Sequence, residues 1–242
     1  MYTYFLSYND YFTNVNTGFG QLGHLLAFNP GKVDATFDVT VYFENRDTMK
    51  FMLPAPAGAS TESNWESWAN IPLGTKFAYK VECEVPLALQ VTIGQNNTGN
   101  DYSPNAPGYP DRVRETVLSY TPGVLAKEFY LPDGIVIISP KTIWVLEHEW
   151  LILVNPEDAT VEVKVEAMYG KDNVLSFSEV VEANRVKYIF MDEKVPSLRH
   201  YGAKVTCGSP LAAQWLRTVN WYDKEELMSY WSVPLIPGPL GK

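Results

Sequence analysis

The sequence predicts an all-β fold made of two homologous antiparallel β-sandwich modules in tandem. Three observations predict it: a long-range internal repeat, strand-like alternation in both copies, and scarce helical signal. The 242 residues suit two small domains of about 100–150 residues each. With 46% apolar residues, the chain has enough material for packed cores.

The repeat is carried by two segments that share the pattern K-V-x-C-x-x-P-L-A-x-Q. They begin at Lys80 and Lys204, 124 residues apart, and make Cys83 and Cys207 equivalent. Asp-Ala-Thr triplets at 34–36 and 158–160 have the same spacing. The preceding Asn-Pro pairs, at 29–30 and 155–156, lie 126 residues apart. The sequence therefore predicts a loop two residues longer in the first copy, between the Asn-Pro pair and the triplet.

We place the modules at about 1–125 and 126–242. Leu-Ser-Tyr at 118–120 resembles Met-Ser-Tyr at 228–230, but at a spacing of only 110 residues. The first copy is therefore predicted to carry an insertion within 94–112, which is rich in Asn, Gly and Pro. Such a loop is either a ligand-binding element or a surface excursion, and its composition leaves both open.

Strand alternation is clearest at 37–41, 81–85 and 161–165, where apolar residues occupy every second position. This period is typical of half-buried strands in antiparallel sheets. The segment 175–191 is predicted to be a hairpin that turns at 182–185. Only 223–228 has the composition of a short helix or turn.

Charge and composition exclude several classes of protein. The net charge of −9 disfavours a nucleic-acid binder, because phosphate contacts are made by Lys and Arg. Apolar runs such as 135–138 fall far short of a membrane span of about 20 residues. The N-terminus lacks the basic start of a signal peptide, and two cysteines make no disulfide framework. We expect a cytoplasmic protein with reduced thiols and no membrane insertion.

The second module contains segments that resemble those of a known protein family. It has His-Glu-Trp-Leu-Ile-Leu-Val-Asn-Pro at 148–156, an Ala-Asn-Arg turn at 183–185, and Pro-Leu-Ala-Ala-Gln-Trp-Leu-Arg at 210–217. In this order the segments resemble the family of the cyanobacterial sensory rhodopsin transducer. The resemblance covers most of 145–232 and, more weakly, 20–120.

The resemblance implies a small all-β sandwich that assembles into oligomers and binds a small molecule, with a carbohydrate as the expected class. The positions that match the family's polar signature are Glu149, Arg185, Gln214 and Arg217. The first module departs from that signature: Ile93 stands at the position of Arg217, no Arg lies near 57–61, and His24 is displaced relative to His148. Its ability to bind anything is therefore in doubt.

The residues themselves leave two roles open. Gln214 and Arg217 lie three apart on a strand, so their side chains face opposite sides unless the strand bulges. Arg217 either binds a ligand's hydroxyl pair or carboxylate, or forms an ion pair with an acid such as Glu149, which we favour slightly. Gln214 and its counterpart Gln90 are equally suited to satisfying backbone groups.

Aromatic residues are concentrated in the second module. Trp215 and Tyr222 are our candidates for stacking on a sugar ring, although Trp and Tyr also fill cores and oligomer interfaces. The other rings of this set are Trp150, Trp221, Tyr230 and Trp231, and Trp65 with Trp68 are candidates for a rim.

No motif indicates catalysis, a metal site or a cofactor. We therefore expect a non-enzymatic protein that binds a carbohydrate or sugar acid, in a signalling or metabolic-sensing role, and that forms a homo-oligomer. Two alternatives stay open. One is a carbohydrate-active enzyme with paired carboxylates between the modules, and the other is an oligomeric scaffold.

Overall fold

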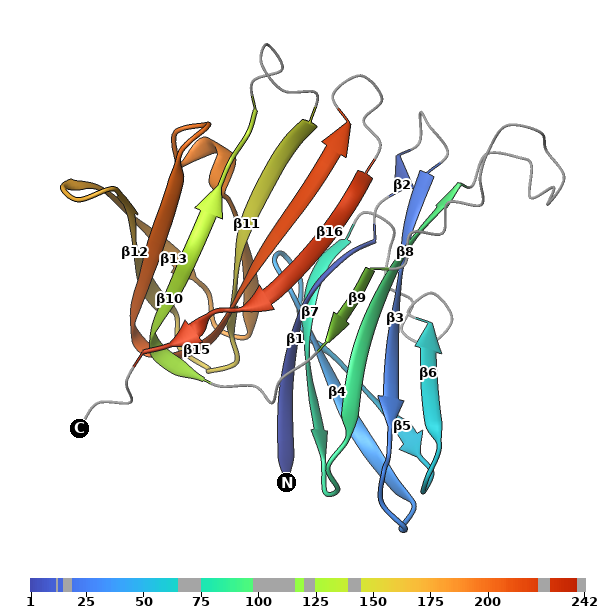
Figure 1. The fold of residues 1–242 in the computed structure, drawn as a ribbon. Helices are drawn as coiled ribbons and strands as arrows, with labels where there is room; N and C mark the ends of the chain where they lie inside the picture. Colours follow the sequence, from blue (N-terminus) through green and yellow to red (C-terminus); the bar gives the residue numbers. More distant parts are fainter. Residues whose placement is uncertain are drawn as a thin grey trace, which may run out of the picture. The chain divides into compact units, whose positions relative to one another are not determined.

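The computed structural model describes residues 1–11, 13–14, 19–64, 75–97, 116–119, 125–138, 145–221 and 227–238. The chain divides into two compact units, one of residues 1–41 and 49–122 and the other of residues 42–48 and 123–242. Among the described residues, the only helical element is a 3-10 turn, η1 (Met191–Glu193), and every strand pairing is antiparallel (Figure 1). The all-β prediction is confirmed.

The first unit contains two sheets. The first has the order β1-β7-β4-β5, from β1 (Tyr2–Tyr11), β7 (Thr75–Cys83), β4 (Ala35–Phe43) and β5 (Met49–Ala55). The second has the order β2-β3-β8-β9, with β6 beside β3. Its strands are β2 (Thr13–Asn14), β3 (Phe19–Phe28), β8 (Ala88–Asn97), β9 (Thr116–Ser119) and β6 (Ser60–Asn64).

The second unit repeats this plan around one long strand, β15 (His200–Trp221). The first half of β15 pairs with β10 (Ala126–Ile135) and β12 (Val161–Tyr169), and β12 pairs in turn with β13 (Asn173–Val181). Its second half pairs with β11 (Val145–Asn155) and β16 (Leu227–Pro234), and β14 (Arg185–Phe190) pairs with β11. The short β17 (Ile236–Pro237) pairs with β10.

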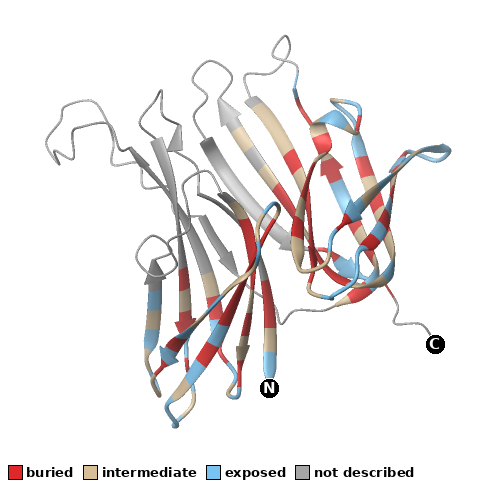
Figure 2. Ribbon diagram, turned by 180° about the vertical axis from the view of Figure 1, so that it is seen from behind, coloured by how far each residue is buried: buried red, intermediate tan, exposed pale blue. Residues whose placement is uncertain are grey.

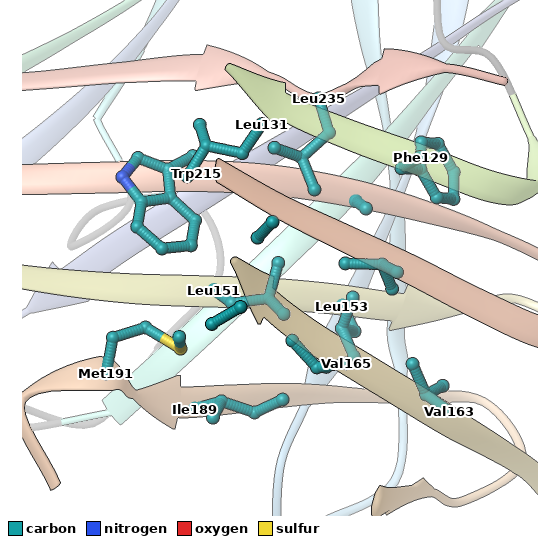
Figure 3. Packing of buried hydrophobic residues seen from close by; sticks show 14 of the residues in the cluster. Phe129, Leu131, Leu151, Leu153, Val163, Val165, Ile189, Met191, Trp215 and Leu235 are labelled. Carbon is teal, nitrogen blue, oxygen red and sulfur yellow. The ribbon is translucent and has the colours of Figure 1, made fainter. Parts of the chain in front are cut away.

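The core of the second unit lies between these two halves. On β12 the burial alternates strictly over the first five residues, with Val161, Val163 and Val165 inside and the charged residues between them outside. Leu151 and Leu153 of β11 pack in the same cluster, together with Trp215 of β15 (Figure 3). Figure 2 shows bands of buried and exposed positions along the strands; the period of two holds over β12, whereas 39–43 on β4 and 151–155 on β11 are buried without a break.

The strand order is the same in the two units, since β1-β7-β4-β5 corresponds to β10-β15-β12-β13. The register agrees as well: Gln90 lies opposite Leu26, and Gln214 lies opposite Ile152. Cys83 is on β7 and Cys207 on the corresponding part of β15. The module boundary proposed from the repeat stays a prediction about ancestry.

The Asp-Ala-Thr triplets do not occupy corresponding places. Ala35 pairs with Ala55, and Val161 pairs with Val181, so these positions keep the 126-residue offset of the Asn-Pro pairs. The predicted longer loop between the Asn-Pro pair and the triplet is therefore wrong. The offset changes to 124 only between β5 and β8, because Gln90 and Gln214 are 124 apart. The triplet match was a coincidence of residue type two positions out of register.

A buried asparagine holds the same turn in each unit. Asn155, which has no exposed surface, donates from Nδ2 to the carbonyl oxygens of Ala159 (2.8 Å) and Val181 (3.2 Å) and accepts from the Glu157 amide (3.1 Å). Asn29 donates to the corresponding carbonyl oxygens of Val33 (2.9 Å) and Ala55 (2.8 Å) and accepts from the Gly31 amide (2.9 Å). Each asparagine thus fixes the geometry between four strand ends.

The second unit's turn at 182–184 belongs to this arrangement. β13 pairs with β12 and β14 pairs with β11, so the chain crosses from one sheet to the other and the predicted hairpin at 175–191 is wrong. Asn155 accounts for the crossing, because its side chain also donates to the Glu182 carbonyl (3.0 Å). Asn184 adopts a positive φ of 55°, as Gly58 does (65°) at the matching turn of the first unit. The predicted helix at 223–228 and most of the insertion lie outside the described residues.

Replacing Asn155 by Ala is expected to lower the free energy of unfolding by about 3 kcal/mol, because buried carbonyl and amide groups lose their partner. Urea unfolding of Asn155→Ala measures this change. Asn173→Ala, at an exposed position of β13, is the matched control and should change stability by less than about 0.5 kcal/mol. Equal effects of the two substitutions would contradict the proposed role of Asn155.

Candidate functional site

Two of the predicted site residues meet at the centre of the second unit. Glu149 on β11 lies directly opposite Arg217 on β15. Directly opposite residues in an antiparallel pair point to the same face, so the strand register alone brings the two side chains together. Arg217 donates to Glu149 Oε1 from Nε (2.7 Å) and approaches it from Nη2 (2.6 Å).

The Glu149 carboxylate is fully buried and is surrounded by donors. Besides Arg217, the Ile135 amide donates to Oε1 (2.9 Å) and the Tyr201 hydroxyl donates to Oε2 (2.6 Å). Burial raises the pKa of Glu149, and the hydrogen bonds from Tyr201, Ile135 and Arg217 oppose that rise. Burial, together with the neighbouring carboxylate, also raises the pKa of the Tyr201 hydroxyl. The hydroxyl therefore stays a donor.

Arg217 is committed to this network. Its side chain is 12% exposed, and it also donates to the Asp133 carbonyl (3.4 Å) and lies 3.8 Å from the Glu147 carboxylate. Of the two roles that the sequence left open, the structure places Arg217 in the ion pair with Glu149. A charge held this way inside the fold organises the packing around it and is poorly placed to bind a ligand.

The network extends to the neighbouring residue on β11. Asp192 of η1 accepts from the Glu149 amide (3.1 Å), and its other oxygen binds His148 Nδ1. The His148 ring lies beside Trp150 and Phe190, with centroids 6.2 and 6.0 Å away. Sequence reasoning missed Asp192 and Tyr201, because their contacts to β11 span more than 40 residues and neither lies in a recognisable motif.

The remaining predicted residues do not join this cluster. Trp215 is only 3% exposed and belongs to the apolar core, so the prediction that its ring stacks on a ligand is wrong (Figure 3). The reason is strand parity: Trp215 pairs with Leu151 and shares its inward face. Gln214, on the opposite face, is half-buried, as is Gln90. Tyr222 lies outside the described residues, as do Trp65 and Trp68.

Arg185 lies in a different place. It begins β14 opposite Asn155, whereas Glu149 is six residues earlier on β11, a separation of about 20 Å along the strand. The guanidinium pairs with the Asp47 carboxylate (3.0 Å) and donates to the Asn184 carbonyl (3.3 Å). The four positions of the polar signature therefore do not form one site.

Arg185 lines an open depression of about 530 Å³ in the second unit. The Lys187 side chain lies beside it, and the Glu44 and Glu182 carboxylates complete the charged lining. Glu44 is held in place because its Oε1 accepts the Tyr188 amide (2.8 Å). The other residues of the lining are Asn45, Val180 and Val186. A space of this size with cations and carboxylates on its walls can hold a small polar molecule.

The described part of the chain contains no group of three or more His, Cys, Asp or Glu side chains with the geometry of a metal site. Over the same residues, no helix has the length and apolar character that crossing a bilayer requires.

No protein-family model and no curated protein matches this chain. Among solved structures, the chain resembles that of Thermotoga maritima 1070, with 15% identity over 47% of this chain and 95% of the other and a TM-score of 0.41. It also resembles the Anabaena sensory rhodopsin transducer, with 14% identity over 38% and 95% and a TM-score of 0.32. A Bacteroides uniformis β-glucuronidase shares 11% identity and a TM-score of 0.21, and this chain spans about a quarter of its length (25%).

Replacing Arg217 by Met is expected to lower the free energy of unfolding by about 3–5 kcal/mol, because the substitution leaves the Glu149 carboxylate buried without its cation. The double variant Glu149→Gln with Arg217→Met should be more stable than Arg217→Met alone, since a neutral amide needs no cation: its oxygen can accept from the Ile135 amide while its NH2 donates to the Tyr201 hydroxyl. Urea unfolding of the wild type, both single variants and the double variant measures the coupling.

The stability of the same variants should also depend on pH. In Arg217→Met, the folded-state pKa of Glu149 lies above its unfolded value, so the native state binds more protons. The stability of Arg217→Met relative to the double variant should therefore rise as the pH falls from neutrality toward the pKa of Glu149 in the unfolded chain. A difference that is independent of pH would contradict a buried carboxylate at this position.

Proposed function

We propose that the chain is a non-enzymatic small-molecule binding protein of the sensory rhodopsin transducer type, with a carbohydrate ligand and, within that class, a sugar acid. The observation that carries this proposal is the open charged depression that Arg185 and Lys187 line. Its volume of about 530 Å³ falls in the range of small-molecule sites, which is about 300–1,000 Å³.

The contacts of Arg185 favour an acidic ligand. Its partner Asp47 has a side chain that is 99% exposed, and an ion pair with so exposed an acid contributes little stability. A ligand carboxylate can therefore replace Asp47 at small cost and form a bidentate pair with the guanidinium. Asn45 and Glu182 supply hydrogen-bonding groups for hydroxyls in the same depression.

A carbohydrate-active enzyme is the second candidate, because two carboxylates, Glu44 and Glu182, line the same depression. Glycoside hydrolysis uses such a pair. The Glu149 carboxylate does not suit that role, since donors from three residues already occupy its oxygens. Hydrolysis of chromogenic glycosides and glucuronides that Glu182→Gln abolishes would favour the enzyme over the binding protein.

The expected cellular setting, inferred from the N-terminal sequence and the cysteine count, is cytoplasmic, and the expected assembly is the homo-oligomer that the resemblance implies. Both accompany the proposed function and do not depend on the identity of the ligand.

Isothermal titration of the full chain with glucuronate and galacturonate should give saturable binding, and Arg185→Gln should weaken it at least tenfold. That loss corresponds to about 1.4 kcal/mol, within the range of a hydrogen bond to a charged group. Glucose, which lacks the carboxylate, should bind more weakly than glucuronate.

Arg199→Gln is the matched control, because Arg199 is exposed in the same unit and does not line the depression. It should leave the affinity unchanged. The absence of binding by either sugar acid at millimolar concentration would overturn the sugar-acid proposal, and so would equal losses in the two variants.

A further inference from the structure

We propose that strand β13 is a dimerisation edge, at which two copies of this chain pair β13 against β13 around a two-fold axis. The resemblance implied a homo-oligomer without a surface, and this inference supplies the surface from the structure of the second unit. It does not rest on the ligand proposal, since the backbone of β13 carries the contact.

β13 ends its sheet. Among the described strands it pairs only with β12, through all nine of its residues from Asn173 to Val181. Its outward side chains are Val174, Ser176, Ser178 and Val180, and the two valines are 58% and 53% exposed. A nine-residue edge strand without proline or lysine is a template for another strand.

The first unit shows how the same edge is blocked. β5 corresponds to β13, because Asn29 donates to Ala55 and Asn155 donates to Val181, 126 positions later. By this offset, Lys50 stands where β13 has Ser176, and Pro54 stands where it has Val180. Edge lysines and prolines are the usual means of preventing strand addition. β13 has neither.

Pro54 also indicates which backbone groups β13 leaves free. Proline has no N–H, and Pro54 pairs opposite Thr36 as Val180 pairs opposite Glu162. At position 54, therefore, β5 donates no backbone N–H hydrogen bond to β4. By the same register, the N–H and C=O groups of Val180 face away from β12, and alternation extends this to 174, 176 and 178.

The outward face of β13 is self-complementary. A two-fold axis through Phe177 places Val174 of one copy opposite Val180 of the other, and Ser176 opposite Ser178. Apolar side chains then meet apolar ones and hydroxyls meet hydroxyls. The same register brings together the free N–H and C=O groups of those four positions and puts the two Phe177 rings side by side.

Charge permits this contact despite the net charge of −9. None of the four outward side chains is charged. The only acid in the strand, Glu179, faces the other side and pairs with Lys194 (2.9 Å) and Lys187 (3.7 Å). The four outward positions of β13 therefore add no contact between like charges to this pairing.

Sedimentation equilibrium of the full chain in 150 mM salt tests the edge. The wild type should form a dimer, and Val180→Pro, which transfers the blocking residue of β5, should raise the dissociation constant at least tenfold. Met52→Lys, at an exposed site of β5, is the control and should leave it unchanged. Ser176→Lys provides the same block if Val180→Pro disturbs folding by circular dichroism.

A second pair of variants tests the register. Ser176→Glu with Ser178→Glu places acids opposite acids twice across the axis and should abolish the dimer. Ser176→Lys with Ser178→Glu places unlike charges opposite each other twice and should keep the dissociation constant within about threefold of the wild type. Equal effects of the two double variants would overturn the pairing about Phe177.

The outcomes separate this inference from the general expectation of an oligomer. A wild type that stays monomeric at 100 µM concentration overturns both. A dimer that neither Val180→Pro nor Ser176→Lys weakens overturns the β13 edge alone.

Discussion

The fold of each unit depends on one buried asparagine at the end of a strand. Asn155 binds carbonyl groups from two turns at once, and Asn29 does the same in the first unit. Because these turns join strands of different sheets, the asparagine sets how the sheets meet at that end. It also fixes the start of β14, and thereby the position of Arg185 and the depression beside it. A residue without exposed surface thus determines where the second unit presents its charged groups.

The fold class was predictable from the sequence because two signals agreed. Period-two alternation, as in β12, reflects burial on one face. The K-V-x-C-x-x-P-L-A-x-Q repeat marks the end of β7 and the start of β8 in the first unit and lies within the single strand β15 in the second. The finer register was not predictable. The Asp-Ala-Thr triplets matched by letter, whereas the strand pairs Ala35–Ala55 and Val161–Val181 show an offset of 126. Sequence identity over three residues is weaker evidence than the pairing of two strands.

The site was predictable only in part, and for a physical reason. Strand neighbours such as Glu149 and Arg217 can be proposed from residue type, and the register then confirms that they meet. Trp215 shows the limit: an aromatic residue in a strand is as well suited to a core as to a ligand, and its parity with Leu151 decides for the core. Asp192 and Tyr201 were missed because their contacts depend on the tertiary fold. The depression beside Arg185 combines segments more than 100 residues apart, which no local pattern encodes.

The two units also show which features the fold itself does not require. Gly23 and Ile93 occupy the paired positions that Glu149 and Arg217 occupy in the second unit, and the first unit has the same strand order without that ion pair. Burying a carboxylate and a guanidinium carries a desolvation cost that apolar residues avoid. The same contrast appears at the sheet edges, where Lys50 and Pro54 of β5 correspond to Ser176 and Val180 of β13. In both places the first unit carries the residues that simplify folding or prevent association, and the second carries those that complicate it. Within the part of the chain that the structure describes, the features that need an explanation beyond stability are the second unit's buried charge network, its charged depression and its open edge.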